Sequence, residues 1–185
     1  MSASHVGRLL VATPKLADAN FARAVVFMIA HDEDGAFGII LNRPLNQADL
    51  ADMLPQWRAL AALPKVAFSG GPVDSGMALA LARRRSDEPF PGWTPVPCDA
   101  GLLDLTSDPL EPGLALTAVR VFSGYAGWGA GQLDHEVSED AWFVIEPRPE
   151  DLFSEQPERL FHDVLRRQQG ALAMFAHYPA DPGVN

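Results

Sequence analysis

One segment, GYAGWGAGQ at positions 124–132, has the composition of a ligand-binding loop. Its glycines would let a ligand approach the backbone closely, and Trp128 could supply an apolar wall. The segment lacks the lysine of a phosphate loop, and Gln132 stands where a dinucleotide fingerprint needs its third glycine. Two interpretations stay open: a loop that faces a ligand, or a sharp turn in which Trp128 fills the core.

Ser69 is the candidate nucleophile, because it ends a strand-like run and precedes Gly70 and Gly71. Ala67 stands where a nucleophile elbow has its first glycine, so the pattern is only half present. A serine that begins a turn is the plainer interpretation. A hydrolase using Ser69 or a carboxylate is therefore the alternative function, and no catalytic residue is assigned.

The sequence predicts no metal site and no cofactor. The five histidines are scattered, and His135 with Glu136 lacks the second histidine of a zinc-protease motif. The acidic turn at 32–35 lacks the distal glutamate of a calcium loop. Cys98, the single cysteine, has no adjacent base and cannot form an internal disulfide.

The charge balance argues against a nucleic-acid-binding protein. Fourteen Lys and Arg residues face 24 Asp and Glu residues, giving a net charge of −10 that would repel a polyanion. The one strong basic run, residues 83–85, is short and is followed by Asp87 and Glu88. No apolar run approaches the ~18 residues of a membrane span, and the first residues lack a secretory pattern. We expect a cytoplasmic protein without a membrane partner.

The elements that would position these residues are mostly strands. Asp34-Gly35 between the apolar runs 24–30 and 36–41 predicts a hairpin. Asn46 predicts a short helix that Pro55 ends, and the spacing after 154 predicts a helix that stops at Gly170. The proline-rich segment 83–97 predicts a long surface loop with no regular central strand or helix. Further strands are predicted at 6–12, 66–69, 77–81, 114–122 and 141–145. These elements indicate an α+β fold with a mixed β-sheet, hairpins and flanking helices, in one compact domain covering 1–185.

Several short motifs follow one another along the chain: LLVATP at 9–14, FARAVV at 21–26, LNRP at 41–44, GGPV at 70–73, GYAGW at 124–128 with GQL at 131–133, and then Glu136, Trp142, Tyr178-Pro179, Pro182 and Asn185. Together they resemble the YqgE/AlgH family of bacterial proteins over nearly the whole chain. Ala24 replaces the serine that is usual there. The resemblance implies a single α+β domain in the bacterial cytoplasm with no established enzymatic activity. One branch carries a transcriptional-regulator label, but the chain shows no helix-turn-helix pattern with a basic second helix.

The sequence and the resemblance together favour a non-catalytic binding or regulatory protein over an enzyme. Its partner is expected to be a small anionic ligand or another protein, with the oligomeric state left open. Arg43 would supply a cationic fork and Trp128 an apolar wall. The motif residues should converge where strands end. The candidate binding residues are Asn42, Arg43, Gly70, Gly71, Trp128 and Gln132.

Overall fold

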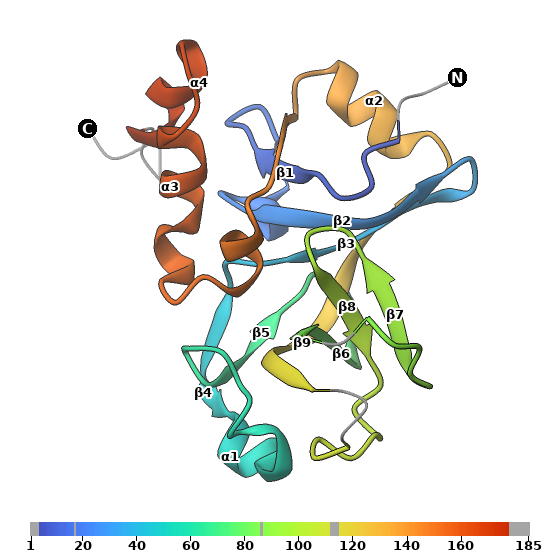
Figure 1. Ribbon diagram of the computed structural model, residues 1–185. Helices are drawn as coiled ribbons and strands as arrows, with labels where there is room; N and C mark the ends of the chain where they lie inside the picture. Colours follow the sequence, from blue (N-terminus) through green and yellow to red (C-terminus); the bar gives the residue numbers. More distant parts are fainter. Residues whose placement is uncertain (1–3, 17, 86, 112–114, 178–185) are drawn as a thin grey trace.

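A ten-stranded, curled sheet forms most of the protein (Figure 1). The structure is a computed structural model that describes residues 4–16, 18–85, 87–111 and 115–177. The main path runs β10-β1-β2-β3-β9-β6-β8-β7, with β5 beside β9 and β4 beside β5. The strands are β1 Leu9–Ala12, β2 Val25–Asp32, β3 Gly35–Ile40, β4 Pro44–Asp49, β5 Val66–Ser69, β6 Val73–Arg84, β7 Trp93–Val96, β8 Ala100–Leu103, β9 Leu116–Gly129 and β10 Trp142–Ile145. The sheet therefore dominates the expected α+β fold.

The β2–β3 hairpin is confirmed, with Asp32 opposite Gly35 at its turn. Gly35 has a φ of +150°, and a Cβ there would lie 2.4 Å from the carbonyl oxygen of Trp128 on the next strand. Only glycine allows this close strand approach. Most strand pairs are antiparallel, but β5 runs parallel to β9 through Phe68–Phe122 and Ser69–Ser123. The expected mixed sheet is therefore present.

Two segments expected to be loops are strands. β9 continues through the glycine-rich motif to Gly129, and the neighbouring segments approach it closely because Gly35 and Gly70 carry no Cβ. The proline-rich segment 83–97 contains the end of the central strand β6 and the whole of β7. Pro95 is tolerated because β7 is the last strand of the path and pairs only with β8.

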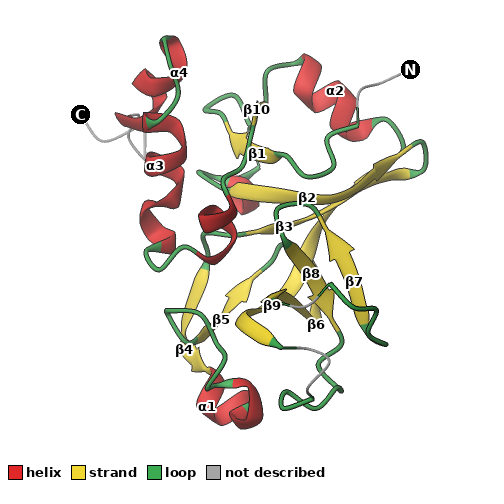
Figure 2. Cartoon of the chain, viewed as in Figure 1, coloured by secondary structure: helices red, strands yellow, loops and turns green. Residues whose placement is uncertain are grey.

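Short helices surround the sheet (Figure 2). The predicted C-terminal helix is α3, and α2 follows the glycine-rich strand. Asp49, rather than Asn46, caps α1, because residue 46 still belongs to β4. The helices are α1 Leu50–Met53, α2 Gln132–Ser138, α3 Leu160–Arg166 and α4 Ala171–Met174, with 3-10 turns at Ala19–Phe21, Pro55–Trp57, Pro149–Phe153, Pro157–Arg159 and Phe175–His177. The motif residues 178–185 lie outside the described residues.

Arg120 joins the sheet to the C-terminal region through a buried guanidinium. It is 1% exposed, lies 4.4 Å from the ring centroid of Phe68, and donates to the carbonyl oxygens of Leu63, Leu152 and Ser154. Burial lowers the pKa of Arg120 to about 10, so it still carries its charge at neutral pH. This side chain holds the chain after β10 against the sheet.

Candidate ligand-binding site

Asn42 has a structural role in the loop after β3. Its side-chain oxygen accepts the backbone N–H of Val25 at 2.9 Å, and its amide nitrogen donates to the carbonyl of Arg23 at 2.9 Å. Both amide groups are therefore used to hold the start of β2. Asn42 positions the backbone next to Arg43.

Arg43 is partly engaged rather than presented as an open fork. Its Nη2 donates to the carbonyl oxygen of Ala22 at 2.9 Å, and its own carbonyl accepts the N–H of Ser69 at 2.8 Å. Burial lowers the pKa of the Arg43 guanidinium. These bonds bring the 42–44 loop against the end of β5, next to Gly70 and Gly71.

Gly70 and Gly71 are required by backbone crowding against β9. A Cβ at Gly70 would lie 2.2 Å from the carbonyl oxygen of Gly124, and one at Gly71 would lie 2.2 Å from that of Tyr125. The amide of Gly70 also donates to the carbonyl of Ser123 at 2.8 Å. The structure thus accounts for both glycines by close packing.

Trp128 is a core residue, only 6% exposed, which matches the interpretation that it fills the core. Its ring stacks on Phe21 at a centroid distance of 6.0 Å. Its indole N–H donates to Glu136 Oε2 at 2.9 Å, and Gln132 Nε2 donates to the other carboxylate oxygen at 2.9 Å. Trp128 and Gln132 therefore belong to the packing between β9 and α2. The segment 21–22 lies between them and Arg43, because Phe21 stacks on Trp128 and the carbonyl of Ala22 accepts from Arg43.

Ser69 is not arranged as a nucleophile. It lies in the parallel ladder between β5 and β9, opposite Ser123. Among the described residues, no histidine side chain hydrogen-bonds to Ser69, as a triad would need. The geometry does not support the hydrolase alternative.

The structure contains a pocket that the sequence did not identify, which we call the Arg84–Trp93 pocket. It has a volume of about 610 Å³ and lies between the end of β6, the following connection and the β7–β8 hairpin. This volume falls within the usual range for small-molecule sites. Its lining residues are Arg84, Asp87, Pro89, Phe90, Trp93, Pro95, Val96, Pro97, Cys98, Asp99 and Ala100.

Arg84 is the charged group best placed to bind a ligand there. Its guanidinium carbon lies 4.7 Å from the ring centroid of Trp93, a cation–π arrangement that holds the side chain in place. Its Nη1 is buried and has no hydrogen-bond partner among the described residues. A buried, unpaired guanidinium N–H is costly, and an anionic acceptor would remove that cost.

Trp93 can lie flat on the sheet because position 101 is glycine. A Cβ at Gly101 would lie 2.3 Å from the Trp93 ring. The ring thus covers Gly101 on β8 while Arg84 lies over it. This stacking keeps the indole against the pocket floor.

The turn between β7 and β8 contributes a neutral thiol. Cys98 and Asp99 have positive φ values of 67° and 54°, typical of a tight turn. Burial raises the pKa of the Cys98 thiol, the carboxylates of Asp99 and Asp151 add to this effect, and Arg83 opposes it. Cys98 is therefore a polar lining group at neutral pH and not an activated nucleophile.

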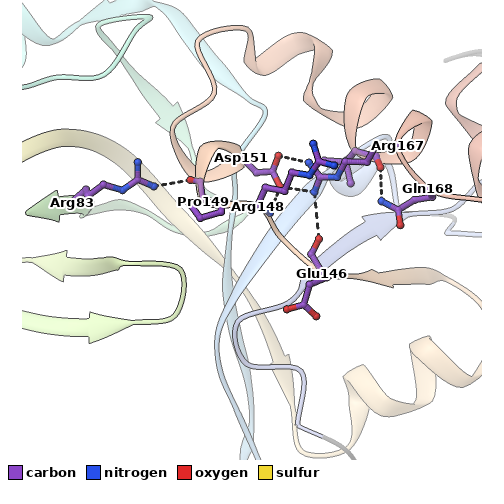
Figure 3. Close-up of polar contacts among 8 residues, drawn as sticks. Arg83, Glu146, Arg148, Pro149, Asp151, Arg167 and Gln168 are labelled. Atoms are coloured by element: carbon purple, nitrogen blue, oxygen red, sulfur yellow. Dashed lines mark hydrogen bonds and ion pairs between the residues drawn. The ribbon is translucent and has the colours of Figure 1, made fainter.

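Arg83 fixes the end of β6 from the opposite face of the strand (Figure 3). Its Nη2 donates to the carbonyl of Pro149 at 2.7 Å, and its guanidinium carbon lies 4.8 Å from the Phe153 ring centroid. Asp151 in the same turn accepts both Nη groups of Arg167 at 2.7 and 2.6 Å. Because successive strand residues face opposite sides, anchoring Arg83 leaves Arg84 directed toward Trp93.

Sequence reasoning missed this pocket because it considered residues 83–85 only as a short basic run and residues 83–97 as a surface loop. One signal was available: Arg83 and Arg84 directly follow the apolar run 77–81 and Ala82, so they could have been placed on a strand with alternating faces. The contact between Arg84 and Trp93 depends on how the hairpin folds back. Residue spacing alone does not specify that.

Known proteins resemble the chain over nearly its full length. The model of the AlgH-like family matches residues 9–173. A UPF0301 protein of Streptomyces coelicolor is 51% identical over 98% of this chain and 96% of its own length. A UPF0301 protein of Mycobacterium tuberculosis is 39% identical over 96% of this chain and 89% of its own length.

Two solved structures share the fold. The crystal structure of protein DIP2367 from Corynebacterium diphtheriae has a TM-score of 0.86 at 26% identity, covering 96% of this chain and 94% of that one. The solution structure of the AlgH protein from Pseudomonas aeruginosa has a TM-score of 0.68 at 29% identity, covering 97% of this chain and 98% of that one.

Within the described part of the chain, every helix is too short or too polar to span a membrane.

Proposed function

The chain belongs to the AlgH-like family, and from this premise and the geometry of the Arg84–Trp93 pocket we propose that it is a non-catalytic binding protein. The ligand is a small anion with a flat apolar body. The domain extends over residues 1–185 and works in the cytoplasm. A regulatory role, as the family label suggests, would follow from ligand binding and would not need direct contact with DNA.

The observation that carries the proposal is the hydrogen bonding of Arg84. Its Nη1 is buried and has no hydrogen-bond partner within the part of the chain that the structure describes, while its guanidinium lies over Trp93. A carboxylate or similar group in the pocket would accept from this nitrogen, and its apolar body would contact Phe90 and Val96. Binding would thereby satisfy the donor and bury apolar surface together.

The other charged lining residues narrow the ligand to a monoanion. Asp87 and Asp99 also line the pocket, so the lining carries one positive and two negative side chains at neutral pH. A polyphosphate or dicarboxylate would be repelled by these acids. A single carboxylate can pair with Arg84 and leave both acids to solvent.

The test is titration of the purified chain with benzoate-type aromatic monocarboxylates, followed by NMR or calorimetry. We expect the acids to bind to wild type and to bind to Arg84→Gln with an affinity lower by at least about tenfold. Arg85→Gln is the control, because Arg85 is an exposed neighbour, and its affinity should not change. The matching aromatic amides should bind weakly. Equal binding of acids and amides, or equal binding to both variants, would overturn the proposal.

A further inference from the structure

Three potential metal ligands from distant parts of the chain meet outside the Arg84–Trp93 pocket. His5 precedes β1, His31 lies near the end of β2, and Asp134 lies in the first turn of α2. One donor atom from each side chain lies within 4.8 Å of the other two. The sequence hid this group because the three positions are far apart and follow no ligand spacing.

The three side chains are partly buried and closely arranged. The His5 and His31 rings stack at 5.2 Å between centroids with planes 17° apart. His31 Nε2 lies 3.7 Å from Asp134 Oδ1, and the side chains of His31 and Asp134 are 6% and 32% exposed. All three ligands are thus partly shielded from bulk solvent.

Hydrogen bonds from the surrounding backbone hold the segments that carry these ligands. Gly7 donates its N–H to the carbonyl of Met28 at 2.8 Å, which fastens the segment after His5 to β2. The helix that carries Asp134 is fixed by Glu136, which accepts from Trp128 and Trp142. The ligands therefore project from anchored elements.

We propose that His5, His31 and Asp134 form a binding site for a divalent transition-metal ion of the zinc class. Two imidazoles and one carboxylate are the donor set that zinc commonly accepts, and three protein ligands leave a position for water. Each histidine would bind the ion through the lone pair of one neutral ring nitrogen. Asp134 supplies the negative charge that a divalent ion requires.

Metal binding would change the tautomer of His31. Without metal, the backbone N–H of His5 donates to His31 Nδ1 at 3.1 Å, so the ring proton sits on Nε2 and faces Asp134. A metal between Nε2 and Asp134 needs that nitrogen's lone pair, so the proton moves to Nδ1. A protonated Nδ1 can no longer accept, so the hydrogen bond from the His5 N–H would break. No net proton is released from His31.

The experiment is zinc titration of the tag-free full chain at pH 7.5, with bound metal measured after dialysis. We expect one zinc ion per chain, and loss of more than about tenfold in affinity for Asp134→Asn and His31→Ala. His135→Ala is the matched control, because His135 is exposed on the same helix and should leave affinity unchanged. Circular dichroism verifies folding, and Asp134→Asn keeps the test valid if His31→Ala does not fold.

Long-range proton–nitrogen NMR of the histidine rings gives an independent readout. His31 should be protonated at Nε2 without zinc and at Nδ1 with zinc. Cobalt substitution should add visible absorption that disappears in Asp134→Asn. The proposal is overturned if zinc does not bind, if the His135 variant weakens as much as the others, or if the His31 tautomer stays unchanged at saturating zinc.

Discussion

Trp128 and Trp142 donate their indole N–H groups to the same oxygen of Glu136, at 2.9 and 2.8 Å. Their rings meet edge to face with centroids 5.9 Å apart. A carboxylate with two lone pairs on that oxygen can satisfy both donors, while Gln132 donates to its second oxygen. One half-buried anion thereby joins β9, α2 and β10.

Glu136→Gln should lower the free energy of unfolding by about 1–3 kcal/mol. The amide keeps the shape but weakens both indole bonds, and its NH₂ group faces the amide nitrogen of Gln132. Urea denaturation measures the change. Glu139→Gln, at an exposed position after the same helix, should have little effect; similar losses in both variants would contradict the role of Glu136.

Gly71→Ala should destabilise the fold by more than about 3 kcal/mol or prevent soluble expression. A Cβ there would meet the Tyr125 backbone at 2.2 Å, and the φ of +151° disfavours any side chain. Gly76→Ala is the control, since the nearest atom to its added Cβ is 3.8 Å away. A Gly71 variant as stable as the Gly76 variant would refute the packing argument.

Trp128→Ala should cost roughly 3–5 kcal/mol of stability, as for other large buried aromatics. Arg43→Ala should cost about 1 kcal/mol, because it removes one hydrogen bond to Ala22 and little buried volume. Thermal and urea unfolding compare the two variants. If Trp128→Ala lowers the free energy of unfolding less than Arg43→Ala does, the interpretation of Trp128 as a core residue is wrong.

Cys98 should react slowly with iodoacetamide at pH 8 compared with the urea-unfolded chain. Burial and the charge of Asp99 raise its pKa, so the thiolate fraction in the folded protein is smaller at that pH and rises only at higher pH. Asp99→Asn should shift the folded pH profile back toward lower pH. A reaction rate that rises at a lower pH in the folded protein than in the unfolded chain would contradict the raised pKa of Cys98.

Limited trypsin treatment should cut first after Arg85, not within 83–84. Arg83 and Arg84 are held in the β6–β9 ladder opposite Ala118 and Leu116, whereas Arg85 is exposed beyond the strand. The two fragments should stay together in native gel filtration, because β6, which precedes the cut, pairs with β8 and β9, which both follow it. Fragments that separate and fold independently would disprove a single domain.

Local patterns predicted several elements well. Asp34-Gly35 specified the hairpin turn, and the apolar spacing around Leu160 specified α3. β9 was cut short in the prediction because its glycines were taken as turn formers, although the strand continues through them and Gly124 packs closely against the backbone of Gly71 and Val73. β7 was missed because Pro95 disfavours a central strand, and only the full strand order shows that β7 lies at an edge.

The site was harder to predict because residue type does not reveal which partner a side chain finds. Arg43 and Trp128 were reasonable candidates, but Ala22 and Glu136 already engage them. Arg84 and Trp93 have the same pair of chemistries and were dismissed as part of a loop. Their contact arises from the return of the β7–β8 hairpin, a long-range feature that sequence periodicity does not encode.

The glycine at position 101 bears on the depth of the Arg84–Trp93 pocket, whereas Arg84 bears on its charge. Gly101 sets the depth, since the indole can lie down only where no Cβ intervenes. Arg84 sets the charge, and it sits on a different strand. The two positions are coupled through Trp93: an exchange at position 101 would displace the indole and with it the support of Arg84, whereas an exchange at position 84 would change the charge of the pocket alone.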